Sequence, residues 1–88
     1  MINPSLISFI ARSKRRTEIL IALKEKEITQ PELRKKNNMY KSHISRSITE
    51  LTTKKLIFCL NPKDREFKSY KITELGRKVI NKVEQIIK

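Results

Sequence analysis

The spacing of the apolar residues changes once along this chain, from a helical period to an alternating one. Ile44, Ile48 and Leu51 recur at positions i, i+4 and i+7, so they form one apolar stripe on a helix from about Lys41 to Lys54. The following apolar run, Leu56 to Leu60, alternates with a period of two, the pattern of a strand. A helix followed directly by a strand predicts an α+β fold.

Two further helices are predicted near the N-terminus. Asn3 and Pro4 are residue types favoured at the N-cap and the first helical position, so they start a short leading helix within 1–12. Ser13 can cap a second helix, from about 14 to 26.

Three cations, Lys14, Arg15 and Arg16, occupy the N-terminal end of that second helix, where the helix dipole disfavours positive charge. Two interpretations stay open. Either one helix continues from Pro4 through this segment, or the cations serve an anion.

A third helix is predicted from a capping box in which Thr29 and Glu32 occupy the two capping positions. It follows a brief extended connection near Ile28. It ends at Asn37-Asn38, because Asn is the non-glycine residue that best tolerates a left-handed backbone. We expect Met39 to fill the space before the helix at 41.

After the strand at 56–60, a second alternating stretch carries Tyr70 and Ile72 on one face, which predicts a two-stranded hairpin. Thr73 can cap a final helix at 74–88. Three core helices, a hairpin wing and a C-terminal helix give a mostly α, α+β winged helix-turn-helix.

Length and composition limit the possible domain organisation and cellular location of the chain. The 88 residues make a single domain, 1–88, because chains divide only beyond roughly 250 to 300 residues. A core this small gains from a partner subunit, so we expect dimerisation. The longest apolar runs are far shorter than the ~20 residues that cross a bilayer, and no secretory signal is evident. We therefore expect no membrane partner and a cytoplasmic location.

The charge balance points to an anionic partner. Lys and Arg number 21 and Asp and Glu nine, which gives a net charge of +12. Seven cations and one anion, Glu50, lie between Leu33 and Lys55, so half of the net charge is in about a quarter of the chain. Nucleic acid is the first candidate, although an acidic membrane or protein surface would also be compatible with this net positive charge.

The segment from Ser42, Ser-His-Ile-Ser-Arg-Ser-Ile-Thr-Glu-Leu-Thr-Thr-Lys-Lys-Leu-Ile, resembles the recognition-helix signature of MarR- and ArsR-like regulators, particularly small archaeal winged-helix regulators. Cys59-Leu-Asn-Pro62 and Ile72-Thr-Glu-Leu-Gly-Arg77 resemble the wing and last-helix openings of that family. Tyr40 stands where the family usually has a small capping residue, and we expect it to cover the turn; the alternative is that its hydroxyl reaches a phosphate. Lys55 stands where the family usually has glycine, so it is expected to be left-handed.

The predicted function is sequence-specific binding of double-stranded DNA by a transcriptional regulator, with the helix at 41–54 in the major groove. Arg46 is the candidate for a bidentate contact with guanine, and the wing is expected on the backbone or in the minor groove, with Arg65 nearest its tip. Asp64 and Glu66 make a plain solvated turn an equal alternative for the wing. The candidate DNA-binding residues are Lys41, Ser42, His43, Ser45, Arg46, Thr49, Lys35, Lys36, Lys54, Lys63, Arg65 and Lys68.

A homodimer is expected through apolar residues of the first and last helices, although this face could instead cover the core of one chain. The candidate dimerisation residues are Leu6, Ile7, Ile10, Val79, Val83, Ile86 and Ile87. Two other functions remain open: a winged-helix protein-interaction module, or a non-specific nucleic-acid-binding protein.

Enzyme function is not expected. One glycine does not make a phosphate-binding loop, and one cysteine with one histidine does not make a metal site. We expect no catalytic residue, no cofactor and no metal. Cys59 is interpreted as a small hydrophobic residue and not as a redox sensor.

Overall fold

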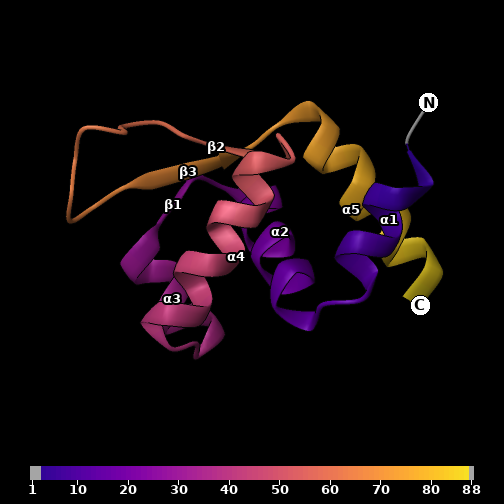
Figure 1. Cartoon of the computed structure of the whole chain (residues 1–88), viewed down its shortest axis with the longest axis horizontal. Coiled ribbons are helices and arrows are strands. Elements are labelled where there is room, and N and C mark those ends of the chain that lie inside the picture. Colours follow the sequence, from indigo (N-terminus) through magenta and orange to yellow (C-terminus); the bar gives the residue numbers. More distant parts are fainter. Residues whose placement is uncertain (1–2, 88) are drawn as a thin grey trace.

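The computed structural model describes residues 3–87 of the chain, with side chains up to residue 86. In this part of the chain, helices and short strands follow one another as predicted for a winged helix-turn-helix (Figure 1). The elements are α1 (Pro4–Ala11), α2 (Lys14–Glu25), β1 (Ile28–Thr29), α3 (Gln30–Asn37), α4 (Lys41–Thr53), β2 (Ile57–Cys59), β3 (Ser69–Ile72) and α5 (Glu74–Ile87). The three-helix core is α2, α3 and α4, and β2 and β3 form the wing.

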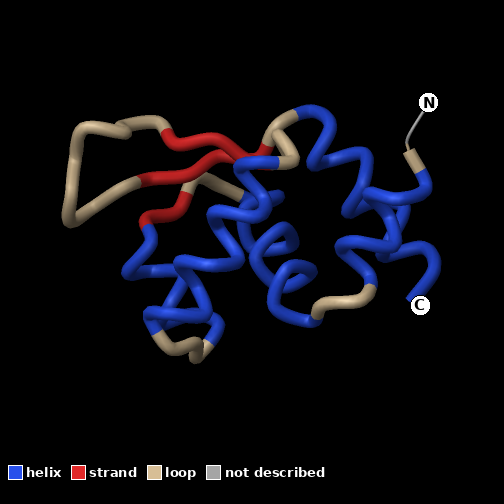
Figure 2. Tube along the Cα trace, viewed as in Figure 1, coloured by secondary structure: helices blue, strands red, loops and turns tan. Residues whose placement is uncertain are grey.

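The sheet is antiparallel with the strand order β1-β3-β2, so it has one strand more than the predicted hairpin (Figure 2). In β2 and β3, Ile57 pairs with Ile72 and Cys59 with Tyr70. The added strand is the extended connection at Ile28, which pairs with Tyr70 on the other edge of β3. Two residues are too few to show an alternating pattern, and their strand geometry comes from this distant pairing.

The core is built around α2, which packs against α1, α3, α4, β3 and α5. The apolar stripe of α4 faces this centre: Ile44, Ile48 and Leu51 are each at most 4% exposed. Met39 packs against the core at the turn between α3 and α4, as predicted. The buried stripe fixes which face of α4 remains outside.

The helix starts follow the predicted caps. Ser13 Oγ accepts a hydrogen bond from the backbone N–H of Arg16 at 3.3 Å, so α2 begins anew after α1 has ended at Ala11. The interpretation of one continuous helix from Pro4 is therefore wrong. The polar cap at Ser13 competes successfully with helix continuation through this segment.

The capping box of α3 is complete. The backbone N–H and the hydroxyl of Thr29 donate to Glu32 Oε1 at 3.2 and 2.9 Å, and these hydrogen bonds hold the pKa of the Glu32 carboxyl below its ordinary value. The other end of α3 has Asn38 in the left-handed region, at φ 52°. Both ends of this short helix are thus fixed by local hydrogen bonding and backbone preference.

The two departures from the family pattern have different outcomes. Lys55 has φ 61°, so the left-handed position predicted after α4 is confirmed without a glycine. Tyr40 is the N-cap residue of α4 but makes no side-chain capping bond there. Its side chain is 78% exposed, so the prediction that it covers the turn is wrong. It contacts His43 edge to face, with the ring centroids 5.8 Å apart.

The wing carries a pH-sensitive buried phenol. Burial raises the pKa of Tyr70 above its ordinary value, and the charge of Cys59 adds to this shift. Neutral Tyr70 therefore contributes stability below about pH 10, the value for an unfolded tyrosine, and that contribution is lost as the pH rises through the folded pKa. We expect the denaturant midpoint of the wild type to fall faster than that of Tyr70→Phe as the pH rises above about 10, measured by circular dichroism. Parallel pH profiles would show that Tyr70 ionises equally well in the folded chain.

Candidate nucleic-acid interface

The face of α4 opposite its buried stripe lies open to solvent. Since side chains repeat every 3.6 residues, Ser42, Arg46, Thr49 and Thr53 share this outward face, and all are exposed. Thr49 and Thr53 keep their hydroxyls on the helix, where each donates to the carbonyl four residues earlier at 2.9 and 2.8 Å. The outward face therefore presents short side chains around one long cation.

One flank of α4 is tied to α3. Gln30 Nε2 donates to Ser45 Oγ at 3.0 Å, and Ser45 is half-buried. Gln30 also contacts the wing, because its backbone N–H donates a hydrogen bond to the Lys68 carbonyl at 2.9 Å. Ser45, predicted as a DNA contact, is thus also a link between the two helices.

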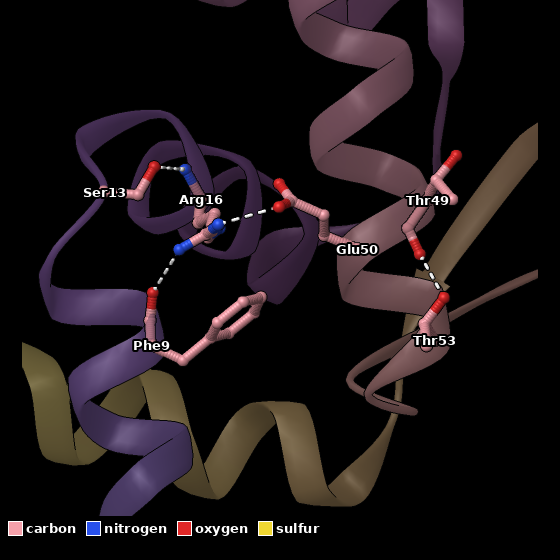
Figure 3. A network of polar contacts seen from close by, with 6 residues as sticks. All are labelled: Phe9, Ser13, Arg16, Thr49, Glu50 and Thr53. Carbon is pink, nitrogen blue, oxygen red and sulfur yellow. Dashed lines mark hydrogen bonds and ion pairs between the residues drawn. The ribbon is translucent and has the colours of Figure 1, made fainter.

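The other flank of α4 is tied to α2 by an ion pair (Figure 3). Arg16 Nη2 donates to Glu50 Oε2 at 2.8 Å, and Arg16 Nη1 donates to the Phe9 carbonyl at 2.8 Å. The guanidinium also lies over the Phe9 ring, 3.9 Å from its centroid. One side chain therefore joins α1, α2 and α4.

A cationic cleft separates the helix-turn-helix from the wing. We name it the helix–wing cleft; its volume is about 260 Å³. Four of its side chains are cations and one is a carboxylate, so its field favours an anion. It is lined by Gln30, Pro31, Arg34, Lys41, Arg65, Glu66 and Lys68.

A second hollow lies along the α2 flank of α4. We name it the α2–α4 hollow; its volume is about 250 Å³. It is lined by Ser13, Arg15, Arg16, His43, Arg46, Ser47 and Glu50. Three arginines surround one carboxylate here, and that carboxylate is already paired with Arg16. The exposed face of α4 therefore has a positively charged hollow on each side.

The structure brings only some of the predicted cations to these hollows. Of the cations of α3, Arg34 lines the helix–wing cleft, whereas Lys35 and Lys36 line a different hollow beside Glu32. Lys54 lies at the end of α4, and its ammonium is 5.6 Å from the Phe9 ring centroid. Which of the three consecutive cations of α3 lies near the exposed face of α4 depends on how the two helices cross. The sequence of the run alone does not predict this.

The wing is shaped by two polar side chains. Asn61 Nδ2 donates to the Phe67 carbonyl at 2.9 Å, and Asn61 Oδ1 accepts from the backbone N–H of Ser69. Asp64 Oδ1 accepts from the backbone N–H groups of Glu66 and Phe67 at 2.9 and 2.8 Å. Asp64, which weakened the case for a DNA-contacting wing, thus organises the turn.

The three wing cations predicted to contact DNA differ in exposure. Lys63 and Arg65 are exposed, and Lys68 is half-buried at the helix–wing cleft.

The predicted dimerisation residues divide into three groups. Ile10, Val79 and Val83 are completely buried within the chain, because α1 folds against α5. For these three the prediction of a subunit contact is wrong, and they cover the core of the single chain. Leu6 and Ile7 are half-buried and Ile86 is 61% exposed; the side chain of Ile87 lies outside the described part of the chain.

Sequence reasoning missed three contributors: Gln30, Arg34 and Arg15. Arg34 lies in the same run of cations as Lys35 and Lys36, which were predicted in its place. Gln30 carries no sequence signal beyond its place at the start of α3. Arg15, in contrast, belongs to the cations at the start of α2, whose unfavourable position relative to the helix dipole suggested service to an anion. The structure places Arg15 in the α2–α4 hollow.

Comparison with protein-family models identifies the family of this chain. Residues 4–88 match the model of the HVO_A0261 N-terminal domain. The chain belongs to this family. A search of curated proteins found no match.

Several known structures share the fold. The transcriptional regulator BldR from Sulfolobus solfataricus is 25% identical, with a TM-score of 0.77 over 85% of this chain and 55% of that chain. A mutant MarR from E. coli, complexed with operator DNA, is 20% identical, with a TM-score of 0.75 over 94% of this chain and 64% of that chain. Reduced HlyU from Vibrio cholerae is 18% identical, with a TM-score of 0.77 over 94% of this chain and 86% of that chain.

These comparisons confirm the predicted resemblance to MarR-like winged-helix regulators of the small archaeal type. This member of the HVO_A0261 N-terminal domain family therefore has a MarR-like winged-helix fold. The chain spans about half the length of BldR and just under two thirds of that MarR chain. Within residues 3–87, no helix has the length and apolar character needed to cross a bilayer.

Proposed function

We propose that this member of the HVO_A0261 N-terminal domain family binds double-stranded DNA sequence-specifically and regulates transcription. The observation that carries the proposal is the exposed face of α4, where Arg46 lies among short hydroxyl side chains. The opposite face of the helix is buried in the core. BldR is a transcriptional regulator, and the MarR structure contains operator DNA, which supports the same role for this chain.

In this proposal α4 is the recognition helix. The major groove of B-DNA is about 12 Å wide and admits one helix, and Arg46 makes a bidentate contact with guanine O6 and N7. Ser42 and Thr49 let the helix approach closely and contact bases or phosphates. Lys41 and His43 contact the backbone at the entrance of the groove.

The two hollows beside α4 suit the two phosphate backbones that border a major groove. The helix–wing cleft offers Arg34 and Lys41 to one strand, and the α2–α4 hollow offers Arg15 to the other. Such contacts orient the protein on the duplex without reading its sequence. Lys35, Lys36 and Lys54 add to the positive field and do not select a sequence.

The wing contacts the neighbouring backbone or enters the minor groove. Because Asn61 and Asp64 hold the turn through hydrogen bonds, Lys63 and Arg65 reach the DNA from a preformed loop. A cation on an ordered loop loses less conformational entropy on binding than one on a flexible loop.

The deciding experiment is a selection of bound fragments from a random pool of duplex DNA by the full chain. We expect enrichment of a short motif that contains guanine, because Arg46 contributes the main base contact. A pool that stays random after several rounds would contradict sequence-specific regulation. Steep salt dependence with no enriched motif would identify a non-specific nucleic-acid-binding protein instead.

We also propose that two copies bind together through the end of the molecule formed by α1 and α5. Leu6, Ile7 and Ile86 are the predicted dimerisation residues that keep exposed surface there. A two-fold axis at this end would place two recognition helices on half-sites about 34 to 36 Å apart, so the enriched motif would be palindromic.

Sedimentation velocity at micromolar concentration tests the dimer. We expect a two-chain species in the wild type and a shift toward monomer in Ile86→Glu, because a charge at this exposed position opposes apolar burial in the interface. Asn81→Glu, which adds the same negative charge at an exposed position on a different face of α5, serves as the control. A wild type that stays monomeric both free and bound to DNA would refute the dimer.

A protein-interaction module is the second candidate function, and one observation favours it. Phe58, Leu60 and Phe67 of the wing are exposed by 42%, 41% and 58%, an unusual set of apolar residues for one hairpin. If partner binding were the function, DNA association would be weak and without a preferred motif, whereas substitution of Phe58 and Phe67 by Ser would abolish binding of the partner.

A further inference from the structure

Two opposite charges of the recognition helix lie four residues apart. Arg46 and Glu50 are at positions i and i+4, and both line the α2–α4 hollow. On a helix surface, opposite charges at this spacing attract each other. In an isolated α4, Glu50 would therefore draw the guanidinium of Arg46 along the helix and away from a base edge.

In the folded chain Glu50 has another partner. Its carboxylate pairs with Arg16 at 2.8 Å, whereas none of the ion pairs among the described residues includes Arg46. The Arg16 side chain is only 19% exposed, and its second terminal nitrogen is bound to the Phe9 carbonyl. Because the fold already holds Arg16 in place, its pairing with Glu50 costs less side-chain entropy than a pairing with Arg46 would.

We propose that Arg16 is a positioning residue for DNA reading: by holding Glu50, it leaves Arg46 available for a base. This inference rests on the proposed function of α4. It also predicts an effect of Glu50: without Arg16, the Glu50 carboxylate would compete with DNA for Arg46. The specificity of the recognition helix would then depend on a residue of α2 that touches no base.

The test is a set of full-length variants: Arg16→Gln, Glu50→Gln and the double variant. Each is titrated with a guanine-containing duplex recovered by the random-pool selection and with a shuffled duplex. In Arg16→Gln we expect the preference for the recovered duplex to fall about tenfold, because one bidentate base contact is lost. In the double variant we expect a return to within about twofold of the wild-type preference, because the competing carboxylate is gone.

A purely structural role for Arg16 predicts the opposite outcome. Removing Glu50 would then not rescue Arg16→Gln, and an unrescued double variant overturns the proposal. Lys14→Gln is the matched control: it removes one cation from the same helix, where Lys14 pairs with Glu18 at 3.9 Å, and it should leave the preference unchanged.

Arg16→Lys separates specificity from stability. Lysine keeps the charge beside Glu50 but lacks the second arm that binds the Phe9 carbonyl, so we expect lower stability with a preference near that of the wild type. If Arg16→Gln does not fold, the duplex preference of Arg16→Lys tests the proposal. A loss of preference in folded Arg16→Lys, despite the retained charge, would refute the proposal.

A measurement without DNA distinguishes failure of this inference from failure of the proposed function. Solvent exchange of the Arg46 Nε–H is followed by nuclear magnetic resonance in all variants. We expect slower exchange in Arg16→Gln alone, because only there does Glu50 hold Arg46. Equal exchange throughout overturns the inference, whereas a wild type with no preferred duplex but slowed exchange in Arg16→Gln overturns only the DNA-binding function.

Discussion

Substitution of Arg46 by alanine is expected to reduce affinity for the preferred duplex about tenfold to a hundredfold while reducing affinity for random DNA much less. A bidentate arginine–guanine contact discriminates by ~1 to 3 kcal/mol, and about 1.4 kcal/mol corresponds to a factor of ten. The unequal loss is the diagnostic result, because a phosphate contact would weaken binding to every sequence alike. Competition binding at a fixed salt concentration measures both affinities.

Lys36→Ala is the matched control for charge. Lys36 is an exposed cation of α3 that lines hollows beside Glu32 and beside Glu18, away from the exposed face of α4. It should weaken binding to both duplexes slightly and equally. An Arg46 variant that behaved in this same way would show that Arg46 contacts only the DNA backbone.

Substitution of Gly76 by alanine is expected to have the largest effect on stability. A Cβ atom on Gly76 would lie 2.1 Å from the backbone carbonyl oxygen of Leu56 and 2.7 Å from Ile72 Cγ1. The same carbonyl accepts hydrogen bonds from the backbone N–H and hydroxyl of Thr73, so it cannot move without disturbing the start of α5. We expect a loss of about 3 kcal/mol or more, at the upper end for overpacked sites.

For a domain of this size, about 3 kcal/mol is a large part of the total stability and lowers the melting temperature by roughly 12 to 24 °C. Thermal unfolding followed by circular dichroism measures the shift. Asn81→Ala, an exposed position on the same helix, should be neutral or slightly stabilising because alanine has the higher helix propensity. If Gly76→Ala matched this control, the close approach of α5 to Leu56 would be disproved.

The elements with local signals were predicted well. Ser13, Thr29 and Asn38 act within a few residues of the helix ends that they define, so the sequence nearby contains the necessary information. The left-handed Lys55 was predicted from a resemblance, because the family usually has glycine there. Strand β1 was not predicted as part of the sheet, since its geometry depends on pairing with β3, which lies far along the chain.

The candidate site was predicted less completely, for a related physical reason. The outward face of α4 follows from one periodic stripe, whereas its surroundings depend on how helices cross. Arg16 and Glu50 are 34 residues apart, and no local pattern joins them. The apolar face of α5 was visible in the sequence, but periodicity does not say whether α1 or a second copy covers Val79 and Val83.

Helix α4, the proposed recognition helix, is held on both flanks by side chains that lie outside its exposed face, Gln30 on one side and Arg16 on the other. These two ties keep α4 from rolling about its own axis. Ser42, Arg46 and Thr49 can therefore be exchanged without changing how the helix is seated. A related chain could acquire a different target sequence through a few substitutions at these positions, while its scaffold stayed the same.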